Sequence, residues 1–427
     1  MSFLKISTLL LLTININATT LPQLINSGLA HNSVIKKTEL QIKLMRAKQE
    51  ESRAKRFGEL DAVGSYTHYN LPRTLAPIVP SSLSPTSSVN TTQDLFSSGV
   101  QYSVALFTGG MLEQQINIDK VAQKMAESHQ KLSREELIYN IRSLYLSALS
   151  LQELQLSQES YVEAIRDVRD IISIGLDIGK KAKIELLKAD NDLQSAKGKV
   201  AITKSKLRMT KMNLETLTHF KSINILEPVE VEISEIESLK SDNIEQLERF
   251  RLQDLEIERG DRNIQKVASL KMPQVGLNAY VGHNYDFDQI DPFEKEQLWQ
   301  VAVNVKWNIF DFGANDAKIQ QAKIAKLQAI VAKETTTEGF RQLFAKAQEK
   351  IETSLANYHT NLSQFRLLQE TEKIEEARYD AGVATLNDLL LAKSKTELAK
   401  SQMIQSKYTY QNGIFYLDYL FERGVSN

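Results

Sequence analysis

The chain has 427 residues, and its 52 Lys and Arg nearly balance its 53 Asp and Glu. This balance argues against a nucleic-acid-binding protein, which usually carries a basic excess. The absence of cysteine excludes disulfides, zinc-thiolate sites, iron–sulfur clusters and a cysteine-anchored lipid tail. Only 8 Pro and 17 Gly interrupt the sequence, so we expect long uninterrupted elements.

The N-terminus predicts a secretory signal peptide over residues 1–18. Lys5 precedes an apolar run from residue 6 to residue 16, and Ala18 is a small residue where a signal peptidase could cut. The run is too short to span a bilayer, and no later segment has 18 consecutive apolar residues. We therefore expect export of a mature chain that starts near Thr19 and is not lipidated. A buried N-terminal helix is the alternative.

The sequence repeats itself. A shift of 203 positions places a set of residues on partners of similar type: Phe107, Gly110, Gly179 and Glu185 fall on Phe310, Gly313, Gly382 and Asp388. Upstream the shift becomes 214, where Val63 and Tyr66 meet Leu277 and Tyr280. The first copy is therefore expected to carry an insertion, eleven positions long by the difference between the two shifts, which belongs in a loop.

Period-two alternation predicts a hairpin of two strands in each copy. The expected strands cover about 59–70, 99–107, 274–285 and 298–309. In the last of them Trp299 and Trp307 lie on the apolar side, eight residues apart. This spacing suits the aromatic girdles that flank the apolar band of an outer-membrane barrel. A sandwich strand with buried tryptophans is the alternative.

A very long helix is expected after each hairpin. Residues 111–174 contain neither Pro nor Gly, and at 1.5 Å per residue this helix is about 96 Å long. The predicted segments are a signal peptide (1–18), a first repeat (19–219), a connector (220–241) and a second repeat (242–427). The first repeat contains long helix 111–174, tip 175–182 and return helix 183–218. The second repeat contains long helix 314–381, tip 382–385 and return helix 386–421. Glycines end each long helix, because a left-handed backbone conformation costs glycine little.

Two further segments have irregular patterns. The connector at 220–241 contains Pro228 and then alternating Val229, Val231 and Ile233, which indicates a short strand or irregular structure. The stretch 71–98 holds four prolines and a Ser/Thr/Asn cluster, so a mobile, solvent-exposed loop is expected. A long loop at one end of the hairpins is typical of a barrel that faces outward.

Four strands are too few to close a membrane barrel by themselves. A sheet in lipid must close, because every unpaired backbone group costs several kcal/mol. The smallest single-chain barrels need about eight strands, so several chains must pool theirs. Three copies would supply twelve strands. The expected fold class is thus mainly α with a membrane β-barrel, in a trimer whose helices form a hollow bundle.

Several short motifs, in the same order and spacing, resemble the TolC family of outer-membrane efflux proteins. The resemblance covers essentially the whole mature chain and rests on these segments: Leu21-Pro22-Gln23-Leu24-Ile25 with Gly28, Leu106 to Gly110, Trp307 to Gly313, and Tyr379 to Gly382 followed by Asp388-Leu389-Leu390. It implies a homotrimer with a twelve-stranded barrel in outer-membrane lipid and an α-helical periplasmic tunnel. It also implies docking to a periplasmic adaptor (a membrane fusion protein) and an inner-membrane transporter of the RND, ABC or MFS class, for export of small toxic compounds or polypeptides.

The resemblance also implies a gate at the periplasmic tips. Asp388 stands where the family has an axial carboxylate, but the second acidic position is Leu391 here. Glu185 occupies the matching place in the first copy, and a carboxylate there can accept a hydrogen bond from a tyrosine at the position of Tyr379. A Tyr379–Glu185 latch is therefore expected. The supporting arginine of relatives is Ala384 in this chain. An ordinary solvated acid at a helix start is the alternative for Asp388.

The tips are also the expected docking surface for the adaptor. Their residues are small or exposed: Gly179, Lys180 and Lys181 on one turn, and Gly382, Val383, Ala384 and Thr385 on the other. The lysines could equally be solubilising charges.

No cofactor, metal site or catalytic function is expected. The pattern around Gly175 and Gly179 departs from a phosphate-binding loop, and the six histidines lack the paired spacing of a zinc helix. Two other functional classes stay open from the residues alone: a periplasmic coiled-coil scaffold or adaptor, and a conventional porin.

Overall fold

The structure is a computed structural model that describes residues 18–80, 89–230, 244–286 and 295–424. The predicted signal peptide up to residue 17, and Val231 and Ile233 of the connector, lie outside these residues. By its internal contacts the chain divides into two compact units, each built from both sequence repeats. Unit 1 comprises 1–38, 130–248 and 337–427, and unit 2 comprises 39–129 and 249–336.

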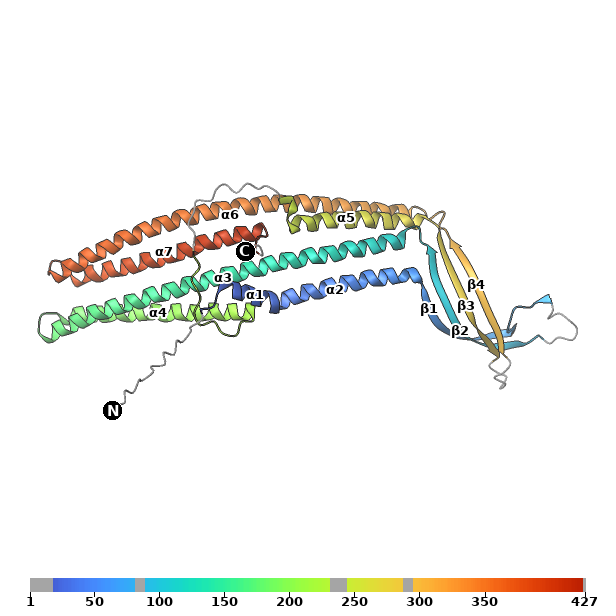
Figure 1. The fold of residues 1–427 in the computed structure, drawn as a ribbon, viewed down its shortest axis with the longest axis horizontal. Helices are drawn as coiled ribbons and strands as arrows, with labels where there is room; N and C mark the ends of the chain where they lie inside the picture. Colours follow the sequence, from blue (N-terminus) through green and yellow to red (C-terminus); the bar gives the residue numbers. More distant parts are fainter. Residues whose placement is uncertain (1–17, 81–88, 231–243, 287–294, 425–427) are drawn as a thin grey trace, which may run out of the picture. The chain divides into compact units, whose positions relative to one another are not determined.

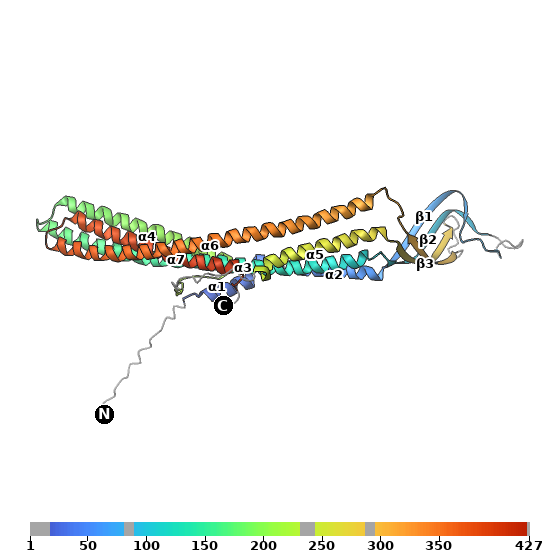
Figure 2. The ribbon, with the colours of Figure 1, turned by 90° about the horizontal axis from the view of Figure 1, so that it is seen from above.

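Unit 1 is helical. It holds α1 (Leu21–His31), α4 (Lys183–Thr218), α7 (Leu386–Leu420), and the distal parts of α3 (Met111–Asp177) and α6 (Ala314–Asp380). Figures 1 and 2 show α4 folded back along α3, and α7 folded back along α6. Two hydrophobic cores hold the unit together, one around Tyr145 and Ile404 and one around Ile165 and Leu389.

The first turn of α1 follows from local sequence. Thr20 is the N-cap, and its hydroxyl accepts a hydrogen bond from the amide of Gln23 at 3.3 Å, while the Gln23 side chain accepts one from the amide of Thr20. Thr19 forms a parallel β-bridge with Leu226 of the connector. The buried Tyr145 hydroxyl lies 2.6 Å from the carbonyl oxygen of Glu227 and 3.1 Å from that of Thr19.

Unit 2 consists of a sheet and the helices that flank it in sequence. The sheet has the antiparallel order β1-β2-β3-β4, with β1 (Glu59–Thr74), β2 (Thr91–Phe107), β3 (Gln274–Asp286) and β4 (Lys295–Lys306), as Figure 1 shows. The unit also contains most of α2 (Ser33–Ala54), all but the first residue of α5 (Glu248–Ala268), the 3-10 turns η1 (Lys55–Phe57) and η4 (Ser269–Lys271), and the first parts of α3 and α6. A further 3-10 turn, η3 (Ile244–Gln246), belongs to unit 1.

The strand register corrects the expected insertion. The shift of 203 equates Val100 with Val303; Val100 pairs with Ala62, and Val303 pairs with Leu277. Ala62 therefore corresponds to Leu277, an offset of 215 positions, and the insertion is one residue longer than expected. The predicted match of Val63 with Leu277 is wrong by one residue, which would turn that strand over because side chains alternate between faces.

The predicted loop over 71–98 is also wrong at both ends, since β1 continues to Thr74 and β2 begins at Thr91. A register shift between His68 and Arg73 accommodates Pro72, which cannot donate a ladder hydrogen bond. Leu75, just beyond β1, is buried, and its carbonyl accepts a hydrogen bond from the side-chain Nδ2 of Asn284 at 2.6 Å. The predicted strand 298–309 is also shifted: β4 begins at Lys295 and ends at Lys306, before Trp307.

Candidate gate and exposed surfaces

Equivalent backbone hydrogen bonds close the turn at each of the two tips. After α3 the amide of Gly179 donates to the carbonyl of Leu176 at 2.9 Å, and the amide of Lys180 donates to that of Gly175 at 2.7 Å. Gly179 has φ +76, in the left-handed region that glycine adopts most easily. This arrangement satisfies the last carbonyls of the helix, as in the usual glycine C-cap.

The second tip has the same geometry at the equivalent positions of the second repeat. The amide of Gly382 donates to the carbonyl of Tyr379 at 2.9 Å, and the amide of Val383 donates to the carbonyl of Arg378 at 2.8 Å. Gly382 has φ +75. Val383 is 70 % exposed, and Lys180 is also exposed, so both turns present side chains to solvent. Ala384, which stands where the resemblance to the family places an arginine, is partly buried.

The two predicted gate carboxylates each occupy the first turn of a returning helix. The Asp388 carboxylate accepts hydrogen bonds from the Thr385 amide at 2.9 Å and the Thr385 hydroxyl at 2.6 Å. The Thr385 hydroxyl, and then its amide, lower the pKa of Asp388. Glu185 accepts from the Ala182 amide at 3.3 Å, but Ala182 has no hydroxyl to cap α4 in return.

Tyr379 lies at the contact between the two helical hairpins of unit 1. It packs against the hydrophobic cluster of α3, α4 and α7 that includes Ile172 and Leu389. Its buried hydroxyl has no hydrogen-bond partner among the residues that the structure describes, so it does not bond to Glu185 in this chain. The Lys181 ammonium, from the other tip, lies 4.5 Å from the centroid of the Tyr379 ring. Lys181 therefore lies between the Tyr379 ring of one hairpin and the tip that carries Glu185 in the other.

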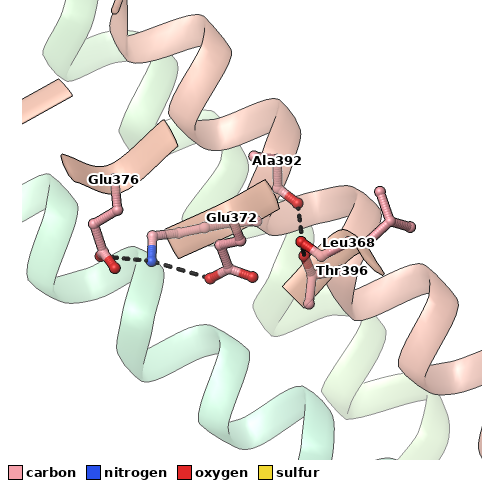
Figure 3. Close-up of polar contacts among 6 residues, drawn as sticks. Leu368, Glu372, Glu376, Ala392 and Thr396 are labelled. Carbon is pink, nitrogen blue, oxygen red and sulfur yellow. Dashed lines mark hydrogen bonds and ion pairs between the residues drawn. The ribbon is translucent and has the colours of Figure 1, made fainter. Parts of the chain in front are cut away.

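A buried charge cluster near the tip went unnoticed in the sequence. Lys393 of α7 is 6 % exposed, and its ammonium lies 2.9 Å from Glu376 and 3.2 Å from Glu372, both on α6 (Figure 3). Burial by itself would lower the pKa of Lys393, but the two carboxylates more than offset it and the pKa is raised. One turn further along, the Thr396 hydroxyl lies 3.1 Å from the Leu368 carbonyl.

One face of the sheet is apolar and open. On β4 the alternate residues Trp299, Val301, Val303 and Val305 are each at least 60 % exposed, and Val281 of β3, opposite Trp299, is 48 % exposed. Trp307 follows the strand, is 57 % exposed, and donates its indole N–H to the Lys271 carbonyl at 3.0 Å. In the described sheet β1 and β4 are each paired along one edge only.

In the described parts of the chain no cluster of three His, Asp or Glu side chains is arranged to hold a metal ion. None of the described helices combines the length and the hydrophobicity that a bilayer-crossing helix requires.

A family model described as outer membrane efflux protein matches residues 24–218 and 246–414 of the chain. No curated protein matches significantly. The match to the family model spans nearly all of the described helices and strands, and it includes both tips.

Solved structures share the fold at low sequence identity. A membrane protein from Pseudomonas aeruginosa is 17 % identical with a TM-score of 0.79, over 95 % of this chain and 92 % of that one. The CmeC outer membrane channel of Campylobacter jejuni is 18 % identical with a TM-score of 0.76, over 95 % and 86 %. The MtrE outer membrane channel of Neisseria gonorrhoeae, solved in an open state, is 18 % identical with a TM-score of 0.75, over 95 % and 89 %. The mainly helical architecture with two repeats that the sequence predicts is therefore confirmed.

Proposed function

The chain belongs to the outer membrane efflux protein family, and from this premise we propose that it is a homotrimeric channel whose three sheets close one twelve-stranded barrel. The observation that carries the proposal is the open apolar face of β4, bordered by Trp299 and Trp307, on a sheet whose β1 and β4 edges are unpaired in the described chain. Lipid would cover the face, and neighbouring copies would pair the edges.

The gate of this channel would lie at the helical tips. Three copies of Asp388 around one axis would attract cations and repel one another, which favours positively charged permeants at the constriction. We assign the latch to Tyr379, Lys181 and Glu185. The cation of Lys181, on the same tip as Glu185, would hold the aromatic ring of Tyr379 on the other hairpin, so that opening requires this contact to break.

The same tips would receive a periplasmic adaptor. Gly179, Lys180, Gly382, Val383 and Thr385 are exposed on two turns of identical backbone form, so an adaptor hairpin could bind both in the same way. Through the adaptor the channel would serve an inner-membrane transporter of the RND, ABC or MFS class. Small toxic compounds or polypeptides are the proposed cargo, and export of the chain would begin with its signal peptide.

The test is the mass of the protein extracted from isolated outer membranes in mild detergent, with the detergent contribution separated by light scattering. Three chains per particle are expected. A monomer, or a protein that stays soluble in the periplasmic fraction without detergent, would overturn the channel and favour a periplasmic coiled-coil scaffold.

A further inference from the structure

The returning helices of the two repeats differ in charge. Between Leu193 and Leu214, α4 carries six Lys and Arg side chains and no Asp or Glu. The offset of 203 places only two cations in the equivalent stretch of α7, which also contains one Glu. The six cations of α4 are Lys197, Lys199, Lys204, Lys206, Arg208 and Lys211, and their equivalents are Lys400, Gln402, Lys407, Thr409, Gln411 and Ile414. The basic stretch is therefore specific to the first repeat.

The cations of this stretch have no acidic partner. Five of the six are exposed, and Lys211 is partly buried. None of them forms an ion pair with a carboxylate in the part of the chain that the structure describes. On α6, by contrast, exposed cations pair with acids three residues away, as Lys373 does with Glu370. A solubilising helix face usually mixes both signs of charge in this way, whereas a face of one sign attracts a partner of the opposite sign.

Four of the cations form one row along the helix. Lys197, Lys204, Arg208 and Lys211 follow one another at steps of seven, four and three residues, which return to the same side of an α-helix. At 1.5 Å per residue the row is about 21 Å long. A single small anion cannot contact all four cations over this length. The row therefore suits an extended molecule that carries several negative charges.

The row borders a hollow between α4 and the connector. The volume of this hollow is about 490 Å³, within the range of roughly 300–1,000 Å³ that is usual for ligand pockets. Its lining includes Lys204, Arg208 and Lys211, and the Lys211 ammonium donates to the Asn224 carbonyl. Burial lowers the pKa of Lys211, and the nearby Glu215 offsets this only in part. An anionic group in the hollow would supply the charge that the chain itself lacks.

We propose that this row and hollow bind a carboxylate-bearing polymer, the peptidoglycan of the periplasm, through Lys197, Lys204, Arg208 and Lys211. The inference rests on the proposed function only in placing the helices in the periplasm, where peptidoglycan carries carboxylates at intervals on its peptide stems. Membrane lipid suits the row less well, because the sheet with the apolar face belongs to unit 2 and α4 belongs to unit 1. Binding would tether the helical part of the channel to the cell wall.

Co-sedimentation with purified peptidoglycan sacculi tests the proposal on the full-length protein in mild detergent. The triple variant Lys197→Gln, Lys204→Gln, Arg208→Gln should bind at least about three-fold more weakly than wild type, because three exposed charge contacts are lost. Added salt should weaken the binding of wild type. The variant should fold normally, since all three side chains are exposed.

A matched variant controls for net charge. Lys180→Gln, Lys183→Gln, Lys188→Gln also removes three exposed cations, at the tip and in the first turns of α4, and should bind sacculi as wild type does. An equal loss of binding in the two triple variants would overturn the proposal, because binding would then follow the total charge of the protein and not the row.

Modified sacculi and vesicles identify the partner. Sacculi whose carboxylates have been converted to amides with carbodiimide and ethanolamine should no longer retain the protein. Retention on the amidated sacculi, or binding to phosphatidylglycerol vesicles without binding to sacculi, would overturn the proposal. So would a wild-type protein that binds neither and is retained only by an acidic protein.

The mass of the detergent-extracted particle separates this inference from the proposed function. A trimer that does not bind sacculi would overturn the peptidoglycan site and leave the channel intact. A monomer that binds sacculi through the row would support the site and overturn the channel.

Discussion

The ammonium group of Lys181 lies 4.5 Å from the ring centroid of Tyr379 and so connects the α3–α4 tip to α6. Such a cation–π contact contributes about 0.5–1 kcal/mol at exposed sites and more where it is desolvated. The Tyr379 hydroxyl adds no hydrogen bond to a described residue. The ring, rather than the hydroxyl, is therefore the part of the tyrosine that the latch uses.

This distinction predicts different effects for two single substitutions. Lys181→Met should raise the single-channel conductance in planar bilayers, because it removes the cation between Tyr379 and Glu185, whereas Tyr379→Phe should leave conductance nearly unchanged because it keeps the ring. Lys180→Met, at the exposed neighbouring position, is the control. If Tyr379→Phe opens the channel and Lys181→Met does not, the latch is a hydrogen bond that forms only in the assembled protein.

Removing Lys393 should destabilise the α6–α7 hairpin. Lys393→Met leaves Glu372 and Glu376 without their cation, and we expect a loss of about 1–3 kcal/mol in the free energy of unfolding, since both carboxylates keep some solvent. Denaturant unfolding of the detergent-extracted protein measures it, with the exposed Lys395→Met as control. Equal stability of the two variants would mean that the cluster contributes nothing.

The same cluster predicts a pH dependence. The pKa of Lys393 is raised in the folded chain, so its stabilisation is fully present below the ordinary lysine pKa and is lost as pH rises through the raised value. Wild type should therefore lose more stability than Lys393→Met on titration into that alkaline range. Parallel curves for the two proteins would contradict the raised pKa.

Tyr145 predicts a second alkaline effect. Burial, reinforced by the nearby Glu227 carboxylate, raises the pKa of Tyr145 to about 12. The unfolded tyrosine ionises near pH 10, so stability should fall between about pH 10 and 12, by roughly 2–3 kcal/mol for a shift of this size. Tyr145→Phe should flatten that slope, although it costs about 1–2 kcal/mol at neutral pH through its lost hydrogen bond. An unchanged slope would assign it to another group.

The two tips differ in their caps, which predicts unequal stability of the returning helices. Thr385→Ala should cost α7 about 1 kcal/mol, and Ala182→Thr should stabilise α4 by a similar amount, because only Thr385 has a hydroxyl for the first turn. Hydrogen exchange of the amides in each first turn measures both. Faster exchange at α7 than at α4 in the wild type would contradict the capping argument.

Much of the fold followed from sequence because its signals are local. The long helices lie in stretches without proline, and the predicted turns at Gly179 and Gly382 are formed by equivalent hydrogen bonds. Sequence alone misplaces β1 because Val63 and Tyr66 resemble Leu277 and Tyr280 at an offset of 214, and only the strand pairing shows that Ala62 is the equivalent of Leu277. Pro72 likewise suggested a loop, where a register shift keeps it in the strand.

The site was less predictable, because its contacts join residues that are distant in sequence. Lys393 looked like any charged position on a helix, and its burial depends on how α7 lies against α6. The pairing of Lys181 with Tyr379 depends on two tips that belong to different repeats of the sequence. The position of Asp388 in the sequence predicts either a helix start or a gate. Its hydrogen bond to the Thr385 amide belongs to the helix start, which depends on neighbouring residues alone.

The unequal enclosure of the two returning helices has a consequence for how the chain can evolve. Seventeen of the 35 residues of α7 are buried within one chain, against seven of the 36 residues of α4. Random substitutions in α7 will more often meet packed neighbours, whereas α4 has more freedom to drift. A mutational scan scored for export competence should find α4 permissive and α7 restrictive, so that new specificity would be acquired more readily through the first repeat.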